Sequence, residues 1–236
     1  MVEIVRPSDP VLARLLSAHP GVVLVDGSFD GLSVLQGEWR RELVVGDPSL
    51  EVAGLVELMD NNPLVCCDRA SVPGAVATLA LVGLGPLARA GLVLEEPVVQ
   101  VAGGVDDGTV GAFLAREGWG GGVVVSVGDE DLKGAVAANI VAMVPTPGDW
   151  GEIDGLYRES FAHSFYVRES SEGVWDAGTV IGRPYACYRL SHTVGDGSSL
   201  LTVQVMADRD GKCGAAQMVH AMNVMCGFEE SLGVGT

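Results

Sequence analysis

The sequence predicts an α/β fold that opens with a nucleotide-fold-like unit, continues into a larger α+β segment and closes with one helix. The first observation is a strand–helix–strand pattern. Val2–Val5 and Gly21–Val25 are β-branched runs, and Pro10–Ala18 between them carries apolar residues at helical spacing. Such a crossover places its two strands parallel in one sheet. The others are an alternation of short apolar runs with helical stretches and a final Ala- and Met-rich run before Gly227.

The elements after the first unit are expected from the same signals. In chain order they are a strand at Leu43–Val45, a helix at Leu50–Met59, a strand at Leu64–Cys67, a helix at Ala75–Ala90, a strand at Glu96–Ala102, a helix at Val110–Glu117, a strand at Gly122–Val127, a helix at Trp150–Phe161, strands at Tyr185–Thr193 and Leu200–Ala207, and a helix at Cys213–Cys226. Gly195-Asp196-Gly197 predicts a hairpin turn between the last two strands. Asp26-Gly27 is expected to close the second strand.

Length, charge and composition exclude several classes of function. The chain has 236 residues, of which 48% are apolar, enough to cover one large core or two smaller ones. With 31 acidic and 14 basic residues, its formal charge of −17 would repel a phosphate backbone, so nucleic acid is not an expected partner. No apolar run is long enough to span a membrane and no secretion signal is evident, so we expect a cytoplasmic protein without a membrane partner.

Cysteine and histidine usage predicts free thiols and no metal. The five cysteines are odd in number and lack CxxC spacing, and the four histidines are scattered along the chain. A structural zinc site needs such ligands clustered at short intervals.

Two segments near the end of the chain carry a family resemblance. Residues 212–225 read KCGAAQMVHAMNVM after Asp208, and residues 156–168 begin Leu-Tyr-Arg and end Phe-Tyr-Val-Arg. The first resembles KGAAGQAVQNMNLM, and the second the Tyr-x-x-Phe-Tyr…Pro-Phe-Val-Arg segment, of the N-acetyl-γ-glutamyl-phosphate reductase family, a group similar to aspartate-semialdehyde dehydrogenases. The resemblance implies a truncated Rossmann-like domain, residues 1–74 with the closing helix 213–236. It also implies a glyceraldehyde-3-phosphate-dehydrogenase-like α+β domain, residues 75–212, for substrate binding and homo-oligomerisation.

The family's catalytic cysteine is replaced in this chain. The family motif Asn-Pro-Gly-Cys-Tyr-Pro-Thr corresponds to residues 72–78, Val-Pro-Gly-Ala-Val-Ala-Thr, which places Ala75 at the nucleophile position. In the family, a thiolate near the helix N-terminus forms a thioester, which a methyl group cannot do. Cys66 and Cys67 are close in sequence, but we expect them on a buried strand away from that helix N-terminus.

The nucleotide loop and the catalytic histidine are also missing. The family opens with Gly-x-x-Gly-x-x-Gly, whereas residues 6–10 read Arg-Pro-Ser-Asp-Pro, without glycine and with Asp9 where a phosphate would lie. We therefore expect no NADP and no other cofactor. The family's histidine segment corresponds to Val127–Lys133, and its phosphate-side loop to Gly103–Asp107, which contain acidic residues instead.

These losses favour a nucleotide-independent, non-redox enzyme or binder of a small amino-acid-derived metabolite. Paired carboxylates can supply an acid and a base, as a cyclase, lyase, dehydratase or hydrolase requires. The candidate catalytic residues are Asp106, Asp107, Asp129, Glu130 and His192, and the candidate substrate-binding residues are Lys212, Tyr166, Arg168 and the position of Ala75. Two alternatives stay open: a non-catalytic partner of a pathway enzyme, and an active NADP-dependent reductase with relocated residues. Each charged candidate could instead have a purely structural role. Lys212, for example, could form a salt bridge between the two expected domains.

Overall fold

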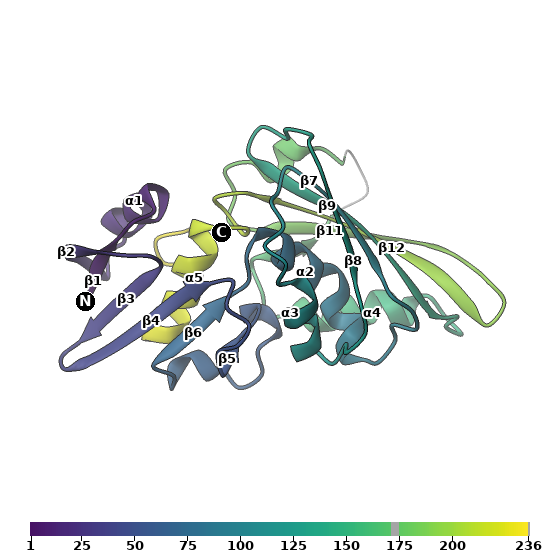
Figure 1. The fold of residues 1–236 in the computed structure, drawn as a ribbon, viewed down its shortest axis with the longest axis horizontal. Coiled ribbons are helices and arrows are strands. Elements are labelled where there is room, and N and C mark those ends of the chain that lie inside the picture. The colour runs from purple at the N-terminus through teal and green to yellow at the C-terminus, as the bar shows by residue number, and fades with distance from the viewer. Residues whose placement is uncertain (171–174, 236) are drawn as a thin grey trace.

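The protein has a mixed α/β fold with two sheets. The computed structural model describes residues 1–170 and 175–235, and within them the chain forms two six-stranded sheets and five α-helices. Residues 171–174 of the expected second domain, and Thr236, lie outside this description. The helices are α1 (Pro10–Ala18), α2 (Ala75–Arg89), α3 (Val110–Arg116), α4 (Gly151–Phe161) and α5 (Ala215–Cys226). Figure 1 shows the first sheet with α1 and α5 at one end of the molecule, and the second sheet with α2, α3 and α4 at the other.

The first sheet contains the predicted strand–helix–strand unit. Its strands are β1 (Val2–Pro7), β2 (Val22–Phe29), β3 (Leu32–Gln36), β4 (Trp39–Val45), β5 (Val52–Ala53) and β6 (Arg69–Val72), in the order β2-β1-β3-β4-β6-β5. The pair β1 and β2 is parallel, as expected. The prediction that Asp26-Gly27 closes the second strand is wrong, because β2 continues through both residues to Phe29. The strand β3, which pairs antiparallel with both β1 and β4, was not predicted.

Two predictions between residues 50 and 67 are wrong. The expected helix Leu50–Met59 is instead the short strand β5 and a 3-10 turn, η1 (Val56–Leu58), because Gly54 between them has a φ of 151° that no right-handed helix contains. The expected strand Leu64–Cys67 is a second 3-10 turn, η2 (Pro63–Val65).

The buried side chain of Arg41 explains why this second segment turns. Its guanidinium donates to the carbonyls of Leu64, Val65 and Cys67 and of Met225, at 2.5, 3.0, 3.2 and 2.7 Å. A guanidinium has no acceptor atoms and a fixed fork of donors, so it gathers carbonyls that point toward one centre. Carbonyls of a strand point alternately to opposite sides, and these do not.

The second sheet carries the larger core. Its strands are β7 (Val98–Ala102), β8 (Val124–Gly128), β9 (Ala135–Pro145), β10 (Val167–Glu169), β11 (Ala186–Thr193) and β12 (Ser198–Asp208), in the order β10-β11-β12-β9-β7-β8. The predicted hairpin of β11 and β12 is confirmed. The long strand β9, which was not predicted, pairs with β12 and β7. Val141 and Met143 on one face alternate with buried residues on the other, so both faces are apolar and the period-2 signal disappears.

Apolar side chains gather in two main clusters. One joins the first sheet with α1 and α5, and the other joins the second sheet with α2, α3 and α4. Residues 76–88 of α2 are buried all round, which fits a helix enclosed on every side. The five cysteines are free thiols. In the part of the chain described, none of the helices is both long and apolar enough to cross a bilayer.

Candidate functional site

A cavity of about 700 Å³ lies at the N-terminus of α2. Ala75, the first residue of the helix, forms part of its wall together with Gly103 at the end of β7. Asp129 and Glu130, which follow β8, and Arg209, which follows β12, also line it. Three strand ends and one helix start therefore place both signs of charge around a methyl group. Among the residues that line this cavity there is neither a cysteine nor a histidine.

The N-terminus of α2 has no side-chain cap and lies beside the carboxylate of Asp107. Gly74 is the N-cap residue and has no side chain to accept the first-turn amides, which have no acceptor within the helix. Oδ1 of Asp107 accepts hydrogen bonds from the amide and hydroxyl of Thr109, and Oδ2 faces Gly74, where an added Cβ would lie only 2.6 Å away. Asp107 therefore places a carboxylate beside the positive end of the helix dipole.

Arg209 is the cation of this cavity, and sequence reasoning did not single it out. Its Nη2 donates to the carbonyl of Gly103 at 3.0 Å, and its backbone amide donates to Gly134 at 2.7 Å. These contacts hold the exposed guanidinium near the ends of β7 and β9. The signal that could have found it is its position directly after the strand that ends at Asp208, three residues before the predicted candidate Lys212.

The structure brings only some of the predicted site residues together. Ala75, Asp129 and Glu130 share the cavity, and Asp107 lies at the helix start beside it. Asp106 is exposed, and its carboxylate accepts the amide of Gly108 without lining the cavity. Arg168 lies over the ring of Tyr185, 4.0 Å from its centroid, and donates to the carbonyl of Phe165.

His192 was predicted to line the cleft, but the structure places it elsewhere. It lies near the end of β11, opposite Leu201, whereas the cavity is beside the other end of the sheet, where Asp208 pairs with Ala135. The β9 partners of these two pairings, Ala142 and Ala135, are seven residues apart, which corresponds to roughly 23 Å along a strand. The imidazole is stacked on Trp150, with ring centroids 3.6 Å apart.

Lys212 and Tyr166 belong to a buried network instead of the cavity wall. Nζ of Lys212 is 2.5 Å from Oε1 of Glu57, and the two side chains are 0% and 2% exposed. His220 lies 3.7 Å from the same oxygen through Nδ1 and contacts Oε2 of Glu230 through Nε2 at 2.9 Å. The hydroxyl of Tyr166 donates to the carbonyls of Glu230 and Gly235. Lys212 therefore forms a salt bridge, with Glu57, as the structural alternative for this residue predicted.

Electrostatics keep the central carboxylate of this network ionised. Burial disfavours the charge of Glu57, but the positive charge of Lys212, aided by His220 when its imidazole is protonated, outweighs burial, so the pKa of Glu57 lies below its usual value. The hydrogen bond from His220 lowers the pKa of Glu230. Sequence reasoning missed Glu57 because it lies in the segment wrongly predicted as an amphipathic helix, where a single acid indicates an exposed face.

The thiol of Cys213, which contacts the backbone of Ala75, is unsuited to act as a nucleophile. Sγ of Cys213 points toward the carbonyl of Ala75 at 3.8 Å, but burial raises the pKa of this thiol to about 12. A nucleophilic cysteine needs a thiolate at neutral pH. Cys66 is exposed on the turn after η2, contrary to the expected buried strand, and Cys67 is half-buried with a pKa raised by burial.

The first turn of α1 does not fit a dinucleotide. Oδ1 of Asp9 accepts the amides of Val11 and Leu12, at 2.8 and 3.4 Å, and its carbonyl accepts the amide of Ala13. Pro10 has no amide hydrogen. Every first-turn donor that a pyrophosphate would use is therefore either absent or already bonded within the chain. Among the described residues, no three His, Cys, Asp or Glu side chains converge to hold a metal ion.

Comparison with known proteins adds no identification. The chain matches no protein-family model and no curated protein. The interpretation of the cavity therefore depends on its own residues.

Proposed function

We propose that this chain is a degenerate relative of the N-acetyl-γ-glutamyl-phosphate reductases that acts without nucleotide. In this proposal residues 1–74 and the closing helix form a truncated Rossmann-like domain, and residues 75–212 form a glyceraldehyde-3-phosphate-dehydrogenase-like domain. Its activity is a non-redox conversion, or the binding, of a small amino-acid-derived metabolite in a biosynthetic pathway. Support comes from the capped first turn of α1 and from Ala75 at the start of α2.

The observation that carries the proposal is the pairing of opposite charges around the cavity at α2. Arg209 and the open first turn of α2 suit a carboxylate, while Asp129 and Glu130 suit an ammonium group. An amino acid or its derivative carries both groups. The methyl group of Ala75 leaves room between them where the family has a sulfur atom.

The same carboxylates define the chemistry that this site could perform. A carboxylate such as Asp129 can take a proton from a bound substrate and return it to a leaving group, which is sufficient for cyclisation, elimination or hydrolysis. None of these reactions needs a hydride donor. Asp107, which lies at the helix start beside the cavity, would position that helix start.

Binding measurements on the purified chain test this function. We expect no saturable heat with NADPH or NADP in calorimetry, and saturable binding of at least one member of a panel of amino acids and their N-acyl, phospho and lactam derivatives. Arg209→Gln and Asp129→Asn should each weaken that binding by about tenfold, since each removes a charged hydrogen bond. Arg14→Gln on α1 is the control. Tight NADPH binding, or ligand binding that ignores both substitutions, would overturn the proposal.

A second candidate, a non-catalytic partner protein, has one observation in its favour. On the face of the second sheet opposite α2, Val141 and Met143 are only half-buried and Leu200 is exposed. An apolar sheet face of this kind is suited to pairing with a second copy or a related subunit. Light scattering coupled to chromatography would distinguish a homo-oligomer from a monomer, and co-purification from native cells would identify a different subunit.

A further inference from the structure

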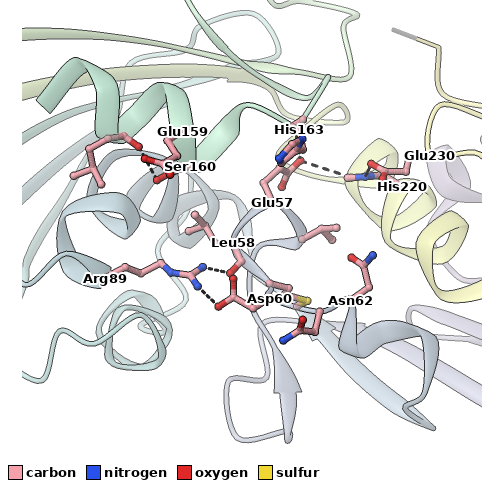
Figure 2. A pocket seen from close by; sticks show the side chains of 15 residues that line it. Glu57, Leu58, Asp60, Asn62, Arg89, Glu159, Ser160, His163, His220 and Glu230 are labelled. Atoms are coloured by element: carbon pink, nitrogen blue, oxygen red, sulfur yellow. Dashed lines mark hydrogen bonds and ion pairs between the residues drawn. The ribbon is translucent and has the colours of Figure 1, made fainter. Parts of the chain in front are cut away.

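A second cavity includes Arg89, at the opposite end of α2 from Ala75, and shares none of the lining residues of the Ala75 site. Its volume is about 630 Å³, and its walls come from η1, the end of α4, α5 and the segment that carries Glu230. Figure 2 shows Glu57 joined to His220 by an ion-pair contact, with the bonded pair of Arg89 and Asp60 on the opposite side of the view.

Two buried polar atoms at this cavity have no hydrogen-bond partner among the described residues. One is Oε2 of Glu57 and the other is Nδ1 of His220, and both side chains are 2% exposed. The other oxygen of Glu57 takes the contacts from Lys212, at 2.5 Å, and from the hydroxyl of Ser164, at 3.3 Å. A buried polar atom without a partner is costly, so a pair of them retained beside a cavity indicates a ligand that completes both.

The charges around the cavity determine which ligand that is. Asp60, Glu159 and Glu230 line it together with the ionised Glu57. Arg89 is the cation among the lining residues, and its guanidinium is already bonded to Asp60 and to the carbonyl of Leu58. Lys212 lies behind Glu57 and is fully buried. The open positions are therefore acceptors in a negative field.

The imidazole can act as a second acceptor. If Nε2 of His220 carries the proton and donates it to Glu230, Nδ1 presents a lone pair only 3.7 Å from the Glu57 carboxylate. An ammonium or guanidinium group has several donors and could bond to Oε2 of Glu57 and Nδ1 of His220 at once.

We infer that this cavity binds a small molecule carrying a protonated primary amine or a guanidinium group, with Glu57 and His220 as its acceptors and Glu159 and Glu230 at the entrance. An anion would meet the carboxylates of Glu159 and Glu230 at the entrance and that of Glu57 inside. A neutral ligand would gain no attraction from these charges.

Four probes of equal chain length separate these cases: n-butylamine, n-butylguanidine, 1-butanol and butyrate, each titrated into the full chain labelled with 15N-histidine. We expect the two cations alone to shift the ring nitrogens of His220, saturably, while the signals of His192 and His19 stay in place. Equal shifts with 1-butanol or butyrate, or no saturable shift with either cation, would overturn the inference.

Substitutions locate the binding. Glu57→Gln combined with Lys212→Met removes both charges of the buried pair and should weaken cation binding at least tenfold. Glu159→Gln, on the exposed entrance, leaves the core untouched and should weaken it about twofold. Glu152→Gln, at an exposed position of the same helix that does not line the cavity, is the matched control and should have no effect. Wild-type affinity in the double variant would refute the site; if that variant does not fold, Glu159→Gln against Glu152→Gln decides in the same way.

Discussion

Nζ of Lys212 lies 2.5 Å from Oε1 of Glu57, and this contact joins the turn after β5 to the segment that leads into α5. Both side chains are almost completely buried, so neither charge is screened by water. Since α5 packs in the apolar cluster of the first sheet and η1 lies next to α2 and α4, the pair connects elements from both apolar clusters.

Breaking this pair on one side should cost more than removing it. Lys212→Met leaves the Glu57 carboxylate buried without its cation, and we expect a loss of about 3–5 kcal/mol of unfolding free energy. Glu57→Gln together with Lys212→Met should cost clearly less than the single change. Urea unfolding followed by circular dichroism measures both. A double variant as unstable as the sum of its two single variants would show that the charges are not coupled.

The pair should also make stability sensitive to acid. The pKa of Glu57 is lowered in the folded chain, so the folded state holds the proton less readily than the unfolded state does. Its stabilising contribution is complete above the unfolded pKa of about 4.3 and is lost as the pH falls through the lower folded pKa. Unfolding free energies measured from pH 6 to pH 3 should therefore fall more steeply for wild type than for the double variant.

Glu117 should give the opposite dependence on pH. Burial raises its pKa to about 7, against the opposing charge of Arg89 at 3.7 Å. The unfolded chain then releases this proton at a lower pH than the folded chain, so stability falls as the pH rises from about 4.5 to about 7.

The change Glu117→Gln tests this dependence directly. The variant should equal wild type near pH 4 and exceed it near pH 8 by up to about 3 kcal/mol, from about 1.4 kcal/mol per pKa unit. Glu38→Gln, at an exposed position, should show no such crossing. Parallel stability curves for Glu117→Gln and wild type at both pH values would contradict the assignment.

The elements that sequence reasoning predicted correctly are those whose signal is local. Pro10 and Ala18 mark the ends of α1, Gly227 ends α5 with a φ of 70°, and Gly195-Asp196-Gly197 turns the hairpin. The failures depend on distant partners. Hydrogen bonds from Arg41, on β4, hold residues 63–67 in a turn, and nothing within that segment indicates this partner.

The residues of the candidate sites also fall into two groups: those indicated by the local sequence and those whose position depends on distant partners. Asp129, Glu130 and Ala75 were found because a resemblance placed them, and the strand ends bring them to one cavity. His192 could not be located without knowing the register of β11 against β12. Glu57 and His220 are 163 residues apart, and their meeting depends on how α5 packs against η1, which no spacing in the sequence encodes.

Substitutions at Gly74 and Asp107 should have non-additive effects on the free energy of unfolding. The backbone of Gly74 has φ −66° and ψ 175°, which alanine adopts without strain, so the cost of Gly74→Ala comes from its new Cβ meeting Oδ2 of Asp107 at 2.6 Å. The carboxylate must then move away from the positive end of α2, a position worth about 0.3–1 kcal/mol. In the background Asp107→Ala that conflict disappears, and Gly74→Ala should cost correspondingly less. Urea unfolding of the four proteins should give a coupling energy of at least about 0.5 kcal/mol, whereas strictly additive changes would mean that Asp107 does not rest against the helix start in solution.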